Sequence, residues 1–375
     1  MKKYFVLSYL FLSLGLFFVP TTYADVGIAT PDAKIEAQVL KVIHEEIVDQ
    51  DGDKQLNQTL EVIIKSGDYK DKKVEASNNN QSVPAAGGRK YQVGDNVFLT
   101  ISKDANGNSL FAVVDYDRTG ALFWLFIFFF VITIIIGRGK GIVSFIGMGF
   151  SILMILYFVL PQLLAGHDPF FIALIASLVI IPLTFYLVHG FNKKTTAAVL
   201  GTILTLFLIG IVSNIAIEAG HLSGFSSEEA GYLDMESPGS VNIKELLLAG
   251  IIIGLLGILD DITISQAAIV YKLQEVSPNL TFRSLYAKAM DIGRDHIASV
   301  VNTLILVYAS AALPLLLLLV KNPAPFKEIL NEEFMAEEII RTLVASAGIV
   351  LAVPITTFLT AFIIKRSTKG TLKNL

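Results

Sequence analysis

From residue 120 onward the chain consists largely of apolar runs that are long enough to cross a lipid bilayer. A transmembrane helix needs about 20 mostly apolar residues, because it rises about 1.5 Å per residue through a hydrocarbon core about 30 Å thick. Hydrophobic residues make up 53% of the 375-residue chain, a share typical of polytopic membrane proteins. The runs predict seven membrane-spanning helices, at residues 120–137, 141–160, 170–189, 195–217, 245–270, 297–320 and 338–364.

Residues 25–119 are different, because they are polar, charged and rich in turn signals. Segments in which apolar and polar residues alternate predict β-strands, since successive side chains of a strand point to opposite faces. Asn106-Gly107 separates two such segments and is typical of a hairpin turn. The pattern predicts a small all-β domain, a barrel of OB or SH3-like type. The predicted strands are 35–43, 58–65, 72–77, 96–102 and 109–115.

Residues 1–24 have the pattern of a secretory signal. Lys2 and Lys3 precede an apolar core, and Thr22-Tyr23-Ala24 is a small-residue cleavage pattern. A cleaved signal peptide and an uncleaved signal anchor both fit, and both direct the following residues out of the cytoplasm. The predicted organisation is therefore a signal segment at 1–24, an extracytoplasmic β domain at 25–119 and a transmembrane helical domain at 120–375.

The basic residues of the loops predict the orientation of the spans, because cytoplasmic loops carry an excess of Lys and Arg. Arg138, Lys193 and Lys194, with further basic residues at 272–294 and 365–373, fall on one side of the membrane. A loop on the other side, at 218–244, is acidic. We therefore predict a multi-pass protein of the cell membrane with its N-terminal β domain extracytoplasmic and its C-terminus cytoplasmic.

The predicted span at 245–270 carries two adjacent carboxylates, Asp260 and Asp261. A charged side chain in a membrane helix costs at least about 2.5 kcal/mol on insertion scales, so it usually faces a bundle interior or a cavity. We interpret Asp261 as an ion or proton site, with Asp260 modulating it by like-charge proximity. Gly250, Gly254 and Gly257 share a helical face with Asp261 and predict close packing against another helix. A water-facing helix end is the alternative for the acids.

A second set of polar residues leads into the predicted span at 297–320. These side chains lie on adjacent faces of one helix, so they form a polar strip that enters the membrane. We interpret the strip as the lining of a path or as a switch, with Arg294 free to pair with a carboxylate. The alternative is an interfacial helix start whose acids lie near a positive N-terminus. The strip comprises Asp291, Arg294, Asp295, Ser299, Asn302 and Thr303.

Several classes of site are not indicated by the sequence. The chain has no cysteine, which excludes disulfides and thiolate metal sites. The five histidines have no metal-ligand spacing, and neither an HExxH motif nor a P-loop is present. The acidic stretch DQDGD at 49–53 lacks the distal glutamate of an EF-hand loop, so we predict a solvated turn there. We expect no metal, no cofactor and, at a net charge of −4, no nucleic-acid partner.

Three segments together resemble one protein family. GILDDITISQ at 257–266, MDIGRDHI at 290–297 and VNTLILVYASAALPLLL at 301–317 resemble the YibE/F family of bacterial multi-pass membrane proteins. The resemblance extends more loosely over the whole chain, including a β domain ahead of about seven spans. It implies an integral membrane protein of uncharacterised activity, and it carries over no catalytic or binding residue.

The residues leave three functions open. The leading hypothesis is a gradient-driven transporter or permease component, because carboxylates at membrane depth commonly bind protons or cations. The alternative is a membrane scaffold or accessory protein whose external β domain binds a membrane or extracytoplasmic protein. The third, an intramembrane hydrolase, needs two facing carboxylates on different helices and has no GxGD motif to support it, so we do not expect an enzyme. The lipid bilayer is the partner that the composition implies, and the oligomeric state stays open.

Overall fold

The computed structural model describes residues 34–50, 53–78, 90–103, 107–311, 313–321 and 325–372. These residues fall into two compact units, one that ends at Ile136 and one that begins at Gly137. The first unit holds a β-barrel and a long helix, whereas the second is helical. The predicted signal segment at 1–24 lies outside the described residues.

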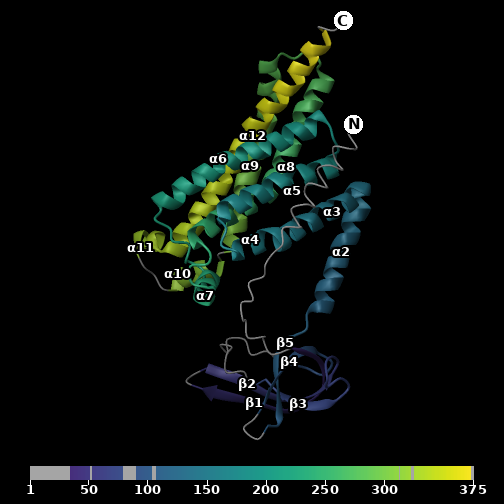
Figure 1. The fold of residues 1–375 in the computed structure, drawn as a ribbon, viewed down its shortest axis with the longest axis vertical. Coiled ribbons are helices and arrows are strands. Elements are labelled where there is room, and N and C mark those ends of the chain that lie inside the picture. The colour runs from purple at the N-terminus through teal and green to yellow at the C-terminus, as the bar shows by residue number, and fades with distance from the viewer. Residues whose placement is uncertain are drawn as a thin grey trace. The chain divides into compact units, whose positions relative to one another are not determined.

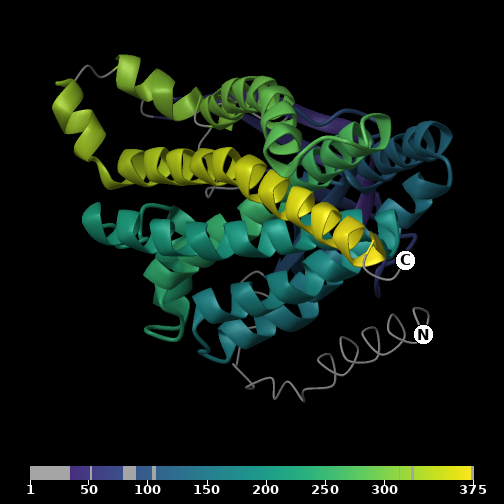
Figure 2. The same ribbon diagram turned by 90° about the horizontal axis from the view of Figure 1, so that it is seen from above.

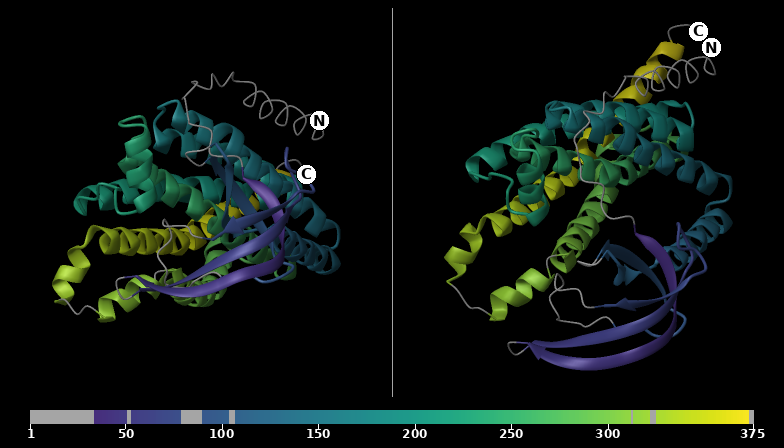
Figure 3. Two further views of the ribbon diagram at one scale, coloured as in Figure 1. Left: turned by 90° about the horizontal axis from the view of Figure 1, so that it is seen from below. Right: turned by 60° about the horizontal axis from the view of Figure 1, so that its bottom comes forward.

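The first unit contains a closed five-stranded barrel, which confirms the predicted all-β domain. Around the barrel the strands follow the order β1-β2-β3-β5-β4, and the β3–β5 pair is parallel while the other pairs are antiparallel. This is a small Greek-key barrel of the OB type. Figure 3 shows its long, curved pair β1 and β2 in purple. The strands are β1 (Ile35–Gln50), β2 (Asp53–Ile64), β3 (Lys73–Ser77), β4 (Asn96–Lys103) and β5 (Ser109–Tyr116).

Alternate residues of the strands form the barrel core. In β1 the buried residues are Ile35, Ala37 and Val39, as a repeat of two residues predicts. Register shifts after Val39 and after Val42 bend this strand, and such irregularities let a sheet curl enough to close. The barrel therefore follows from the local alternation of the sequence.

The first two strands are longer than the sequence pattern predicts. Beyond residue 43 they continue as a pair in which Gln50 lies opposite Asp53. Only the Asp-Gly pair at 51–52 separates them in the sequence, and a loop of two residues keeps its flanking strands in register. The predicted strand ends were wrong there because Ile43 and Ile47 are exposed, so burial does not mark the strand.

Six helices in the described part of the chain are long and apolar enough to span a membrane. They coincide with six of the seven predicted spans and indicate an integral, multi-pass membrane protein. The first is in the barrel unit and the other five are in the helical unit. Their bounds are α2 (Thr119–Gly137), the continuous α3 (Gly139–Met154), η1 (Ile155–Val159) and α4 (Leu160–Leu164), α5 (Pro169–His189), α6 (Lys193–Ala219), α8 (Ile243–Val276) and α12 (Glu333–Leu372).

The span predicted at 297–320 differs in the structure. It is divided between α9 (Phe282–Ala311) and α10 (Leu313–Lys321), and residue 312 between them is not described. Pro314 is the second residue of α10, where proline suits a helix start because its missing N–H has no helical partner. Two shorter helices, α7 (Glu228–Glu236) and α11 (Phe326–Asn331), complete the unit.

Local signals set the starts of the long helices. Asp168 accepts a hydrogen bond of 3.1 Å from the Phe171 N–H and is followed by Pro169, the first residue of α5. Asn192 and Asn242 cap α6 and α8 in the same way. These caps fix where each helix begins, and hence how far along it each polar residue lies.

In the helical unit α12 lies between α6 and α9 (Figure 2), and α8 packs against α5, α6 and α12 (Figure 1). Gln266 of α8 is fully buried where three helices meet. Its Nε2 donates hydrogen bonds of 3.1 Å to the Ala289 carbonyl of α9 and 2.7 Å to the Thr357 hydroxyl of α12. The structure thus brings α8 and α9 into contact. The sequence alone does not determine whether these two helices touch.

Candidate functional site

Asp260 and Asp261 lie past the middle of α8 and line two adjacent hollows between α3, α5 and α8. Asp260 is partly buried, whereas Asp261 is exposed on the surface of the helical unit. Because 3.6 residues complete a helical turn, adjacent residues point about 100° apart, so the two carboxylates meet different parts of the same wall. The acids singled out in the sequence are therefore part of a cavity.

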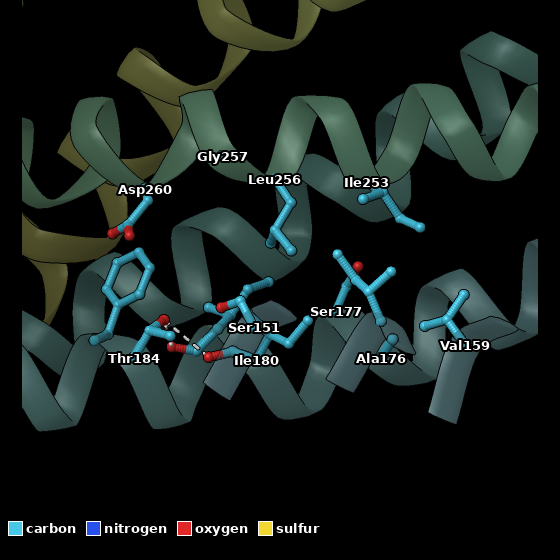
Figure 4. A pocket seen from close by; sticks show the side chains of 13 residues that line it. Ser151, Val159, Ala176, Ser177, Ile180, Thr184, Ile253, Leu256, Gly257 and Asp260 are labelled. Carbon is cyan, nitrogen blue, oxygen red and sulfur yellow. Dashed lines mark hydrogen bonds between the residues drawn. The ribbon is translucent and has the colours of Figure 1, made fainter. Parts of the chain in front are cut away.

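The more enclosed hollow has a volume of about 190 Å³. Figure 4 shows Asp260 projecting into it from α8, with Thr184 of α5 on the other side. Ser151 and Ser177 are the remaining polar side chains of its lining, and the other walls are aliphatic or aromatic. This cavity presents one carboxylate and three hydroxyl groups in an otherwise apolar space.

The second hollow is wider, about 370 Å³, and more open. It shares Ser151, Thr184, Gly257 and Asp260 with the first, so the two spaces adjoin. Its own lining residues include Ser144, His189 and Asp261. The two adjoining hollows thus place further polar groups beside α8.

The hydroxyl groups of this lining are arranged as acceptors. Ser151 donates its hydrogen to the Gly147 carbonyl at 3.1 Å, Thr184 donates to Ile180 at 2.8 Å, and Ser177 donates to Ala173 at 2.8 Å. A hydroxyl has a single hydrogen, so an oxygen that donates it to a carbonyl of its own helix keeps two lone pairs as acceptors. Oxygens of this kind can contribute to a cation site.

Two proline residues lie in the helices that face α8 across the hollows. Pro161 follows η1, a π-helical segment in which the Leu160 N–H bonds to the Ile155 carbonyl, and Ile155 and Val159 line the enclosed cavity. Pro182 lies inside α5, where it cannot donate a backbone hydrogen bond. π-helical turns occur often at functional sites because they displace side chains from the regular helical spacing. The irregular segment η1 thus contributes Ile155 and Val159 to the wall of the enclosed cavity.

Within the described ranges no hydrogen bond or ion pair involves the carboxylate of Asp260 or of Asp261. A buried or half-buried carboxylate without a partner is costly in its charged form. Such a group is neutralised by taking up a proton or by binding a cation. No cluster of three or more His, Asp or Glu residues suited to a metal ion occurs in that part of the chain.

The three glycines of the predicted packing stripe lie on the exposed face of α8. A Cβ atom built on Gly250, Gly254 or Gly257 meets nothing within 4 Å. Gly257 instead borders both hollows. Close helix approach occurs at other glycines: a Cβ on Gly293 of α9 would lie 2.6 Å from Val353, and one on Gly348 of α12 would lie 2.8 Å from Leu255.

The predicted polar strip of α9 is not brought to this cavity. Its six residues are all exposed on the helical unit, whereas Ala289 and Gly293 of the same helix are buried. Arg294 pairs with Asp291 of its own helix at 2.7 Å, and these side chains are 69% and 68% exposed. The two sets of polar residues therefore occupy separate surfaces.

Ser151, Ser177, Thr184 and His189 were missed by sequence reasoning. Single hydroxyl residues are common in membrane helices, and nothing in their spacing links them to residue 260. The one usable signal was that Thr184 and His189 both lie in the last two turns of the predicted span at 170–189, which also contains Pro182. Their contribution emerges only when α3 and α5 are placed against α8.

Another charged group lies at the start of α12. Glu337 is 7% exposed and accepts hydrogen bonds from Ser226 and from Arg341, which also bonds Glu338 at 3.0 Å. This buried carboxylate is fully partnered, in contrast to Asp260. We regard it as a structural ion pair that joins α12 to the connection before α7.

Comparisons with known proteins agree with this architecture. The family model described as YibE/F-like protein matches residues 125–366, and the model for the YibE/F family N-terminal domain matches residues 29–116. A search of curated proteins and a search of solved structures each found no match. Because the first model alone covers more than half of the chain, this protein belongs to the YibE/F family.

Proposed function

We propose that the protein is a gradient-driven transporter or permease component in which Asp260 and Asp261 bind a proton or a small cation. One observation carries the proposal: two adjacent carboxylates, unpartnered among the described residues, line a cavity inside a membrane-spanning helical unit. Uncompensated charge at membrane depth is costly, so uptake of a positive ion stabilises such a site.

The geometry suggests different roles for the two acids. Asp260 lines both hollows, whereas Asp261 lines only the wider one. A cation that enters the wider hollow would meet Asp261 first and then Asp260, where Ser151 and Thr184 offer acceptor oxygens. We therefore assign the primary binding site to Asp260 and the entrance to Asp261. The sequence interpretation gave the opposite roles, with Asp261 as the ion or proton site and Asp260 as its modulator.

The proposal includes an orientation. The distribution of Lys and Arg supports an extracytoplasmic barrel and a cytoplasmic C-terminus. In that orientation the wider hollow, with His189 at the end of α5, is on the cytoplasmic half of the protein. Reagent accessibility of cysteines introduced at residues 193 and 369 in sealed cells tests the orientation directly, since the natural chain has no cysteine.

Ion-linked stability tests the site without a known substrate. Wild type, Asp260→Asn and Asp261→Asn are purified in detergent, and thermal unfolding is recorded across pH and a panel of monovalent and divalent cations. A ligand at 100 times its Kd stabilises the folded state by about 2.7 kcal/mol. We expect one cation or one pH step to stabilise wild type, with the response abolished in Asp260→Asn and weakened in Asp261→Asn.

Asp291→Asn is the matched control, because Asp291 is an exposed, ion-paired acid outside both hollows. It should respond as wild type does. The ion that emerges is then tested for flux in proteoliposomes with and without a gradient. The proposal fails if all three variants keep the ion response of wild type.

A second function is favoured by a different observation. The β1–β2 pair extends beyond the barrel core, and Ile43 and Ile47 of β1 are 46% and 69% exposed. Exposed apolar side chains in such a position suit contact with another protein. If Asp260 and Asp261 prove to be structural, a scaffold protein whose barrel binds a partner becomes the better explanation. The double variant Ile43→Ser, Ile47→Ser should then abolish co-purification of that partner.

A further inference from the structure

The face of α9 that points away from the helical unit has an unusual composition for a membrane helix. Asp291, Asp295, Ala298, Asn302 and Ile305 follow each other at alternating spacings of four and three residues, and all are exposed. This spacing keeps side chains on one straight seam along a helix and is typical of helix pairs. The opposite face of α9, by contrast, packs into the unit.

Asn302 lies at membrane depth. Residues 277–281 link α8 to α9, and Gln266 of α8 bonds Ala289 of α9, so the two helices run antiparallel. Asn302 is about 20 Å beyond Ala289 at 1.5 Å per residue, which places it level with Ile253 of α8, thirteen residues before Gln266 and on the outer side of Asp260. An amide at this depth is costly without a hydrogen-bond partner, and among the described residues it has none.

The charged end of the seam is complementary to itself. Arg294 uses Nη1 to bond Asp291, which leaves further N–H donors of its guanidinium. Asp295 has no ion-pair partner in the described chain. When two such helices lie parallel with a two-fold axis between them, Arg294 of each lies beside Asp295 of the other.

We propose that this seam of α9 is an interface between two copies of the chain, related by a two-fold axis along the membrane normal. An asparagine side chain both donates and accepts, so Asn302 pairs with its own counterpart across the axis. Ala298, one turn away, lets the helix backbones approach closely. Arg294 and Asp295 form two equivalent ion pairs at the end of the seam. In the dimer, Asn302 and Asp295 of each copy thus gain the partners that they lack in a single copy.

Cysteine cross-linking in membranes tests the proposal on the full chain, which has no cysteine of its own. Ala298→Cys places a small thiol on the seam. Val307→Cys is the control, because Val307 is 55% exposed but lies roughly 140° around the helix from Asn302. Under oxidant we expect a covalent dimer from Ala298→Cys at least five-fold above that from Val307→Cys. Adding Asn302→Leu to Ala298→Cys should lower the yield at least three-fold.

Two results overturn the proposal. One is an equal or absent dimer band for both cysteine variants. The other is an Ala298→Cys thiol that is shielded from a membrane-permeant maleimide yet forms no dimer, because another segment or another protein then covers the seam.

A charge exchange between differently tagged copies gives an independent test. Arg294→Asp in one copy and Asp295→Arg in the other restore both ion pairs only in the mixed dimer. We expect the mixed pair to co-purify at least three-fold better than either variant with itself, a result that misfolding cannot produce. Equal recovery of all three pairs would exclude the proposed arrangement.

Discussion

The hydroxyl oxygens of Thr202 in α6 and Thr263 in α8 lie 2.7 Å apart, and both side chains are fully buried. Each hydroxyl also contacts a carbonyl of its own helix, Ala198 at 3.0 Å and Leu259 at 2.8 Å. Two hydrogens serve three contacts, so one of the three lacks a hydrogen at any moment. The pair joins α6 to α8 one turn from Asp260.

This pair should stabilise the helical unit only modestly. After Thr202→Val or Thr263→Val, the remaining hydroxyl keeps its intrahelical carbonyl as a partner. We therefore expect a coupling energy of about 0.6 kcal/mol, the average for hydrogen bonds between membrane helices. A double-mutant cycle of unfolding in denaturing detergent measures it. A coupling above about 2 kcal/mol would show that the intrahelical hydrogen bond does not compensate for the lost bond between Thr202 and Thr263.

Gly201→Ala should destabilise the protein much more. A Cβ atom there would overlap Thr356 Oγ1 and lie 3.3 Å from the Thr356 Cα, so α6 and α12 would have to separate. Overpacking of this kind costs about 1–3 kcal/mol. The midpoint of thermal unfolding in detergent reports the loss.

Gly254→Ala is the matched control for that prediction, because a Cβ on Gly254 meets nothing within 4 Å. Alanine favours a helix over glycine by roughly 0.5–1 kcal/mol, so stability should stay the same or rise slightly. A clear loss of stability would instead mean that another helix packs on the glycine stripe, as the sequence suggests.

Thr184→Val should weaken the proposed cation site while leaving the fold intact. Valine has nearly the shape of threonine but lacks the oxygen that faces Asp260 across the cavity. A neutral ligand of this kind contributes about 0.5–1.5 kcal/mol, which corresponds to roughly 2- to 10-fold in affinity. Titration of ion-linked thermal stability measures the change. Thr303→Val on α9, outside both hollows, should have no effect on it.

In the barrel, Gln58→Leu should cost about 1–3 kcal/mol, because it leaves buried backbone groups unpaired. The Gln58 side chain accepts from the Tyr91 N–H at 2.8 Å and donates to the Tyr91 carbonyl at 3.1 Å. We expect faster amide exchange at Tyr91 and a lower unfolding midpoint for the barrel. The exposed Gln92, changed to Leu in the same way, should leave both unchanged.

Much of the fold follows from local pattern. Alternation placed all five strands, and apolar length placed six spans, because each pattern reflects burial of the segment that carries it. The predicted ends were wrong where a strand or helix extends beyond its buried residues. β1 continues past Ile43 with exposed side chains, and the polar residues before Ile297 are already helical in α9. In both cases a partner strand or a packed face, not local hydropathy, extends the element.

The candidate site was only half visible in the sequence. Asp260 and Asp261 stand out because charge is rare in a span, whereas Ser151 and Thr184 resemble ordinary membrane-helix residues. Spacing shows that the α9 residues share a face, but it does not show which way that face points.

The sequence by itself determined the membrane class, the barrel, most helix ends and the presence of two acids in an apolar helix long enough to span a membrane. These depend on side-chain polarity and capping chemistry within a few residues. The tertiary structure decided that Asp260 borders a cavity, that the glycine stripe is open and that the α9 strip faces outward. Those outcomes depend on the rotation of each helix about its axis, which is set by contacts between segments far apart in the chain, such as Gln266 with Thr357.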